Sequence, residues 1–207
     1  MKTIKKNIPL VLIVVFHLIG LVGFLLDFHQ FKKLSSVNLL LSFGLVLYTC
    51  KQTHIKFYGS LLLIGIFGFC IEVLGVKTGY IFGHYFYGNA FGTKLFNVPL
   101  ILIVNWALLI YSTSLIFKTS STYFNATISA FLMVILDYFI EQSASNLDFW
   151  YWRHHIIPIQ NYVAWFVISF ILNLIFQKII AQKSNSTATG FYVVQLTFFI
   201  LLEFPQK

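Results

Sequence analysis

The run Phe57-Tyr-Gly-Ser-Leu-Leu-Leu-Ile-Gly-Ile-Phe-Gly-Phe-Cys-Ile-Glu-Val-Leu74 decides the fold class. It is apolar on every side, and its single charged residue is Glu72, close to its end. A helix of about 20 residues crosses the hydrocarbon core of a bilayer, so a run of this length predicts a membrane-spanning helix. A transmembrane β-barrel would instead show short segments of alternating polarity.

Runs of the same character lie on both sides of this one: Ile8–Leu26, Leu34–Cys50, Val98–Phe117, Tyr123–Ile140, Asn161–Gln177 and Ala188–Phe204. The composition agrees, since the mean hydropathy is +0.83 and only 10% of the residues are charged. These values exclude an ordinary soluble domain. We expect an all-α, polytopic membrane bundle of about seven transmembrane helices, or six if the short second run does not cross. The whole chain, 1–207, is expected to form a single integral-membrane domain.

The net charge of +8 comes from lysines that are scattered through the loops. They do not form the basic cluster with interleaved aromatic residues that is typical of nucleic-acid binding, and anionic lipid headgroups are sufficient partners. We therefore expect the lipid bilayer, and no nucleic acid, as a partner. The first run follows Lys2, Lys5 and Lys6 and is too long for the apolar part of a signal peptide, so we expect an uncleaved anchor.

The six acidic residues are the strongest indication of function. Every one except Asp27 and Glu203 lies in or beside two aromatic-rich stretches, one from Glu72 to Trp106 and one from Asp137 to Trp165. A carboxylate at membrane depth is costly, so its presence is a hypothesis about function. Aromatic rings beside acids suggest a reaction that passes through a cation.

Asp137 and Glu141 are four residues apart, so they share one face of a helix. Two carboxylates this close in a low dielectric do not both ionise easily, and one of them is expected to hold a proton near neutral pH. The pair would then provide a general acid and a base from one element. The alternative is that the acids form ion pairs with Lys77 or Arg153 and fix the loops.

Glu72 precedes the glycine series Gly75, Gly79 and Gly83. This spacing is compatible with a helix-packing face, but the intervening polar and aromatic residues favour a bent segment in which glycine supplies tight turns. Glu72 would then line a cavity together with Thr78, Tyr85 and Tyr87, or else act as a structural cap. The aromatic loops 75–97 and 142–160 are expected to fold back into the interface or to cap a cavity, both on one membrane face.

Four other residues have two open interpretations. Asn105 and Asn161 either bridge helices through hydrogen bonds or position substrate and water. Trp150 and Trp152 either anchor the chain at the interface or form walls around a cation.

The six histidines lack the spacing of di-iron oxygenases. The chain has a single DxxxE motif and not the several Asp-rich motifs that bind Mg-diphosphate. No metal site is therefore expected.

These residues resemble the integral-membrane carotenoid 1,2-hydratases, which include the bisanhydrobacterioruberin hydratases and the γ-carotene hydratases. The resemblance covers about residues 60–180. It rests on Glu72-x2-Gly75-x2-Thr78-Gly79-x2-Phe82-Gly83-x-Tyr85-x-Tyr87, Gly92, Val98-Pro99, Trp106, Asp137-x3-Glu141-x2-Ala144, Trp150-x-Trp152 and Pro158-x2-Asn161-Tyr162-x2-Trp165.

The resemblance implies carotenoid biosynthesis by a hydro-lyase that adds water across the terminal C1=C2 bond of a carotenoid ψ-end, through a carbocation and without a cofactor. The expected substrate is γ-carotene, lycopene or a related polyene, and the expected location is the bacterial cell (inner) membrane. The catalytic candidates are Asp137, Glu141 and Glu72, with the proton donor expected in the Asp137/Glu141 pair. The substrate-binding candidates are Thr78, Phe82, Tyr85, Tyr87, Trp106, Asp148, Trp150, Trp152, Asn161 and Trp165.

Two other classes of function stay open at this point. A lycopene-cyclase-type enzyme would form the same cation, and a neighbouring double bond rather than water would capture it. The chain could also be a non-catalytic carotenoid or lipid binding protein, or a small transporter. Acids near one membrane face, rather than at the bilayer midplane, weaken the transporter interpretation.

Overall fold

The computed structural model describes residues 2–51, 54–180 and 184–203, with side chains from residue 7 onward. Phe204, where the last expected span ends, lies outside the described residues. In chain order the elements are α1 (Lys2–Leu26), α2 (Phe28–Phe31), the 3₁₀ turn η1 (Lys32–Leu34), α3 (Ser35–Tyr48), α4 (Ile55–Thr78), β1 (Tyr85–Tyr87), β2 (Lys94–Leu95), β3 (Val98–Pro99), α5 (Leu102–Ser114), α6 (Thr122–Ala144), β4 (Trp150–Trp152), the 3₁₀ turn η2 (Arg153–His155), α7 (Ile159–Ile179) and α8 (Ser186–Glu203).

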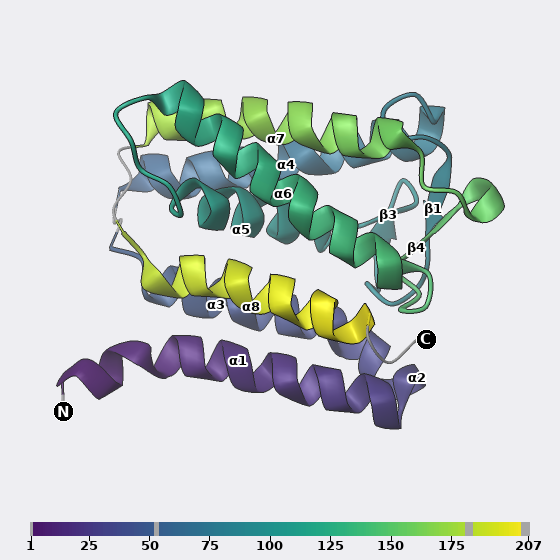
Figure 1. Ribbon diagram of the computed structural model, residues 1–207, viewed down its shortest axis with the longest axis horizontal. Helices are drawn as coiled ribbons and strands as arrows, with labels where there is room; N and C mark the ends of the chain where they lie inside the picture. The colour runs from purple at the N-terminus through teal and green to yellow at the C-terminus, as the bar shows by residue number, and fades with distance from the viewer. Residues whose placement is uncertain (1, 52–53, 181–183, 204–207) are drawn as a thin grey trace.

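The helices confirm the expected all-α membrane bundle (Figure 1). Within the described part of the chain, five helices are long and apolar enough to cross a membrane, namely Asn7–Leu26 of α1 together with α4, α6, α7 and α8. Large apolar side chains point outward from them, such as Leu63 on α4, Val163 on α7 and Val193 on α8. Such an apolar exterior suits contact with lipid.

Two of the expected spans are shorter than the apolar runs that predicted them. The second run contains α3, with 14 residues. The fourth run, Val98–Phe117, contains α5, with only 13 residues. Its first residues, Val98 and Pro99, form β3, which pairs with β2 instead of continuing the helix.

The central position of α5 explains why a short helix is stable here. It packs against α3, α4, α6, α7 and α8. Residues 106–115 are all buried. The ends of a helix that protein encloses meet other side chains rather than lipid, so its length does not have to match the hydrocarbon thickness. Hydropathy alone does not distinguish such an enclosed helix from one that faces lipid.

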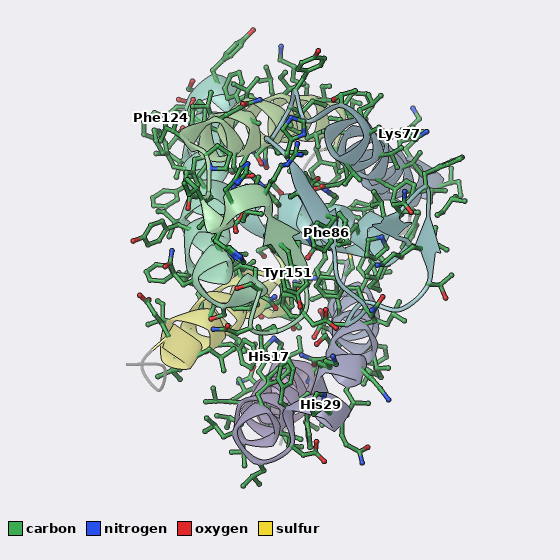
Figure 2. The ribbon with its side chains drawn as sticks, turned by 90° about the vertical axis from the view of Figure 1, so that its right-hand side faces the viewer. His17, His29, Lys77, Phe86, Phe124 and Tyr151 are labelled. Carbon is green, nitrogen blue, oxygen red and sulfur yellow. The ribbon has the colours of Figure 1, made fainter. Side chains whose placement is uncertain are left out.

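The loops after α4 and α6 meet at one end of the bundle, on the right in Figure 1. There β1 pairs antiparallel with β4, and Tyr85, Phe86 and Tyr87 lie opposite Trp152, Tyr151 and Trp150. Figure 2 looks onto this end and shows Phe86 and Tyr151 near one another on the cap. Their rings are stacked, with the centroids 5.3 Å apart. The two aromatic loops therefore form a cap, which is one of the two arrangements expected for them.

The turn from α4 into this cap depends on glycine. Gly79 ends α4 in the left-handed region with φ of 70°, and Gly83 has φ of 109°. Residues with a Cβ rarely adopt these conformations. A Cβ at Gly83 would also lie 2.6 Å from Cγ of Pro158. The glycine series thus serves a bent segment, as expected, rather than a continuous packing face.

Candidate functional site

A cavity of about 360 Å³ lies at the capped end of the bundle. Residues of β1 and β4 line one side of it, and it extends between α1, α3 and α8. Its volume lies within the range of ligand-binding pockets, and its wall is mostly apolar and aromatic. Two carboxyl groups, those of Glu72 and Glu141, are part of this wall.

Glu72 lies near the end of α4 and is only 4% exposed. Its Oε2 accepts hydrogen bonds from the hydroxyl groups of Tyr85 at 2.6 Å and Tyr87 at 2.8 Å. Its Oε1 accepts a hydrogen bond from Nε1 of Trp106 at 3.2 Å. Burial raises the pKa of both phenols well above its ordinary value, and the nearby Glu72 raises it further. Both phenols therefore remain O–H donors at neutral pH.

Glu141 lies in the last turn of α6 and is 7% exposed. Its Oε2 accepts hydrogen bonds from Nε1 of Trp150 at 3.0 Å and of Trp152 at 2.7 Å. Its Oε1 accepts one from Nδ2 of Asn161 at 3.2 Å. Like Glu72, this carboxyl group therefore has three hydrogen-bond donors from the protein.

The strand geometry of the cap explains how these donors converge. Successive side chains of a strand point to opposite faces, so residues i and i+2 point the same way. Tyr85 and Tyr87 of β1, and Trp150 and Trp152 of β4, therefore all face the acids. Phe86 and Tyr151 between them are stacked on the other face.

Asp137 is one helical turn before Glu141 but lies behind the cavity wall. It is 1% exposed, and Asn161 donates to its Oδ2 at 2.8 Å. Its Oδ1 is buried and has no hydrogen-bond partner among the described residues. Asn161 thus bridges Asp137 and Glu141, and of these two acids only Glu141 lines the cavity.

No described lysine or arginine forms an ion pair with these three acids; the ion pair that the described residues do contain joins Lys32 and Asp148. Lys77 lies over the ring of Phe96 instead, 4.7 Å from its centroid. The ion-pair alternative for Asp137 and Glu141 therefore finds no support in the structure. Neutral hydrogen-bond donors compensate for part of the cost of burying these acids.

Aromatic rings form a large part of the remaining wall. Trp165 and Phe82 line the cavity. The ring of Trp165 stacks on that of Trp106, with centroids 4.6 Å apart and an interplanar angle of 13°. Trp106 itself is fully buried behind it and holds Glu72. The ring faces of such residues attract positive charge.

The three acids and their donors all lie within residues 33–204, which match the model of a family described as carotenoid biosynthesis protein. The chain belongs to the carotenoid biosynthesis protein family. This membership assigns it a role in carotenoid biosynthesis and suggests an enzyme of that pathway. Comparisons with curated proteins and with solved structures give no match.

The structure brings most of the sequence-predicted residues together around the cavity and its acids. They are Glu72, Phe82, Tyr85, Tyr87, Trp106, Asp137, Glu141, Trp150, Trp152, Asn161 and Trp165. Thr78 and Asp148 are not part of the wall. Thr78 is exposed and forms hydrogen bonds with the backbone around the end of α4, whereas Asp148 forms an ion pair with Lys32.

Among the described residues, no group of three or more His, Cys, Asp or Glu could hold a metal ion.

The contribution of α1, α3 and α8 to the wall is not predicted from the sequence. His17 of α1 and Gln195 of α8 line the cavity and form a hydrogen bond of 3.1 Å, and Asn38 of α3 lies on the same wall. Single polar residues inside apolar runs are a signal of function in membrane proteins. The sequence carries that signal in these three runs, although their apolar length alone indicates no more than membrane helices.

The ion pair between Lys32 and Asp148, 2.9 Å long, ties the α1–α3 region to the cap. Partial burial alone would raise the pKa of Asp148, but hydrogen bonds from Lys32 and Tyr151 outweigh it and hold that pKa below its usual range. A lowered pKa in the folded state adds stability above the ordinary carboxyl value of about 4, and this is lost as the pH falls through the lowered value.

We expect Lys32→Met to lower the melting temperature in detergent by about 2–4 °C at pH 7, because an ion pair of this kind contributes up to about 1 kcal/mol. The difference from the unmodified protein should shrink as the pH falls through the lowered pKa of Asp148, and it should vanish once this carboxyl group is protonated. Lys33→Met, at the exposed neighbouring position, is the matched control. Equal melting shifts for both variants would show that the ion pair does not stabilise the cap.

Proposed function

We propose that this protein hydrates the terminal C1=C2 bond of a carotenoid ψ-end and produces a tertiary alcohol through a carbocation. The observation that carries the proposal is the cavity itself: Glu72 and Glu141 face a space with aromatic walls, and no described cation neutralises either. A site arranged in this way stabilises positive charge that develops inside it. The carotenoid as substrate class follows from the family.

In the proposed reaction the electrons of the C1=C2 bond form a new C2–H bond, which leaves a tertiary cation at C1. We assign the proton donor to Glu72, because its phenol partners can both donate and accept hydrogen bonds. A protonated Glu72 can therefore give its hydrogen bond to one phenol while it accepts one from the other. The partners accommodate both states of this carboxyl group.

Glu141 has different surroundings, since indole and amide N–H groups donate to it and have no lone pair to offer in return. They favour the carboxylate. We assign to Glu141 the role of the base that takes a proton from the attacking water, while its charge stabilises the cation. Asp137 acts as a positioning residue through Asn161. This assignment differs from the sequence-based preference for a donor in the Asp137/Glu141 pair.

The substrate would reach the site from the membrane, where γ-carotene, lycopene and related polyenes dissolve. The helices of the bundle present apolar side chains outward, and α1, α3 and α8 contribute residues to the cavity wall. One end of a polyene can lie against the acids while the rest of the chain stays in lipid. We propose the bacterial cell membrane as the location.

Product analysis tests this proposal. Expressed in a bacterium that makes lycopene or γ-carotene, the protein should yield a more polar 1-hydroxy-1,2-dihydro product, because water captures the cation. Growth in ¹⁸O-water should place the label on that hydroxyl group. A cyclic product of unchanged mass would indicate cyclisation instead, and a label that came from O₂ would indicate an oxygenase.

A further inference from the structure

The polar side chains on the cavity wall differ in how far the protein itself satisfies them. Glu72 and Glu141 each accept three hydrogen bonds, and Asn161 donates to two acids. Asn105 also lines the cavity, yet its amide forms no hydrogen bond to any described residue. This amide is half-buried and lines the cavity, so its donor and acceptor groups are open to a ligand there.

The position of Asn105 on α5 relates it to the acids. Leu102, one turn earlier, lines the same cavity, so this side of α5 faces the open space. Trp106, the next residue, is turned toward α4 and donates to Glu72. Asn105 thus lines the same cavity as Glu72 and Glu141, and it is carried by a helix that protein encloses, which gives its amide a defined position.

We propose that Asn105 binds and orients the water molecule that captures the cation, an inference that rests on the proposed hydration. To attack, water must point an oxygen lone pair at C1, and its two hydrogens then need two acceptors. Oδ1 of Asn105 is one acceptor and the carboxylate of Glu141 is the other. The new C1–O bond uses the water lone pair, one water proton passes to Glu141, and the alcohol keeps the other. Together with the proton that Glu72 adds at C2, one H₂O has been added, and transfer of a proton from Glu141 back to Glu72 restores both groups for the next cycle.

This role separates two events that a single experiment in D₂O can follow. Protonation of C2 by the acid does not need Asn105, whereas capture of the cation does. When capture is slow, the cation loses a proton from C2 and the C1=C2 bond forms again. Because the acid carries deuterium in D₂O, the recovered substrate then contains deuterium at that carbon. Asn105→Leu keeps the approximate size of the side chain and removes its hydrogen bonds. Lycopene in isolated membranes serves as the probe.

We expect Asn105→Leu to hydrate roughly 10- to 100-fold more slowly, the loss expected for a hydrogen bond to a reacting group. The ratio of deuterium exchange to hydration should rise at least about 10-fold, because the substitution slows capture of the cation and not protonation of C2. Asn105→Asp keeps an acceptor oxygen at the same position and should retain more hydration. Asn173→Leu is the matched control, because Asn173 is a buried asparagine of α7 that is not part of the cavity wall.

Three results would overturn the proposal. The first is hydration by Asn105→Leu at the rate of the unmodified protein. The second is a loss of hydration and exchange in equal proportion, since a general disturbance of the site would act on both. If the Leu variant does not reach the membrane, Asn105→Ala is measured by the same two criteria. The third is the finding that the unmodified protein neither hydrates lycopene or γ-carotene nor introduces deuterium into them. This result would refute the proposed function itself, and the role of Asn105 with it.

Discussion

Glu141→Gln is expected to lower the rate of hydration by roughly 10²- to 10⁴-fold, the range that general acid–base catalysis contributes. The amide has nearly the same size, and its oxygen can still accept from Trp150 and Trp152, so the cap should remain in place. It cannot take a proton from water, and it no longer offers a negative charge to the cation. Turnover of lycopene and the amount of protein in the membrane are the two measurements.

Asp137→Asn is the matched control for this variant, since Asp137 lies on the same helix face but behind the wall. It acts through Asn161, so its replacement should cost about 10-fold or less, the effect of one altered hydrogen bond. Asp137→Asn should also change the pH profile of the reaction less than Glu141→Gln does. Equal losses of activity in both variants would remove the distinction between a base at the wall and a residue that positions it.

Glu72→Gln is expected to lower the rate of hydration about as much as Glu141→Gln does. It should also abolish deuterium exchange into the recovered substrate. The reason is that the proposed proton donor is gone, so no cation forms. Glu141→Gln, in contrast, should retain a measurable part of the exchange because its donor is intact. The combination of the two measurements therefore assigns donor and base separately.

The phenols around Glu72 supply the control for this second prediction. Tyr85→Phe and Tyr87→Phe each remove one of three hydrogen bonds to Glu72 and leave the carboxyl group in place. Each should lose far less activity than Glu72→Gln. Exchange that persists in Glu72→Gln would move the donor to another acid, and Glu141 is then the remaining acid on the wall.

Much of the fold follows from the sequence because the long helices face lipid on one side. Phe57–Leu74 and Tyr123–Ile140 predict α4 and α6 to within a few residues, since their apolar length must match the bilayer. This rule does not apply to α5, which other helices surround. Nothing in the apolar run Val98–Phe117 indicates that its first residues pair with Lys94 and Leu95 instead.

The candidate site, too, can be predicted from the sequence only in part. Spacing places Asp137 and Glu141 on one helix face, but which of them meets the cavity depends on where α7 brings Asn161. This is a matter of packing between distant segments. The glycines beyond Glu72 do predict a turn, and with it a return of Tyr85 and Tyr87 toward the acid. His17 and Gln195 meet only because α1 packs on α8.

The pairing of β1 with β4 also limits how this sequence can change during evolution. Substitutions at Phe86 alter only the outward face of the cap, whereas Tyr151→Phe would also remove the hydrogen bond to Asp148. A single inserted or deleted residue within either strand would invert its alternation, turn its two donors outward and bring an outward ring into the site. Loop length between the helices can vary on either side of these strands, whereas the three-residue strands themselves must be inherited without gaps.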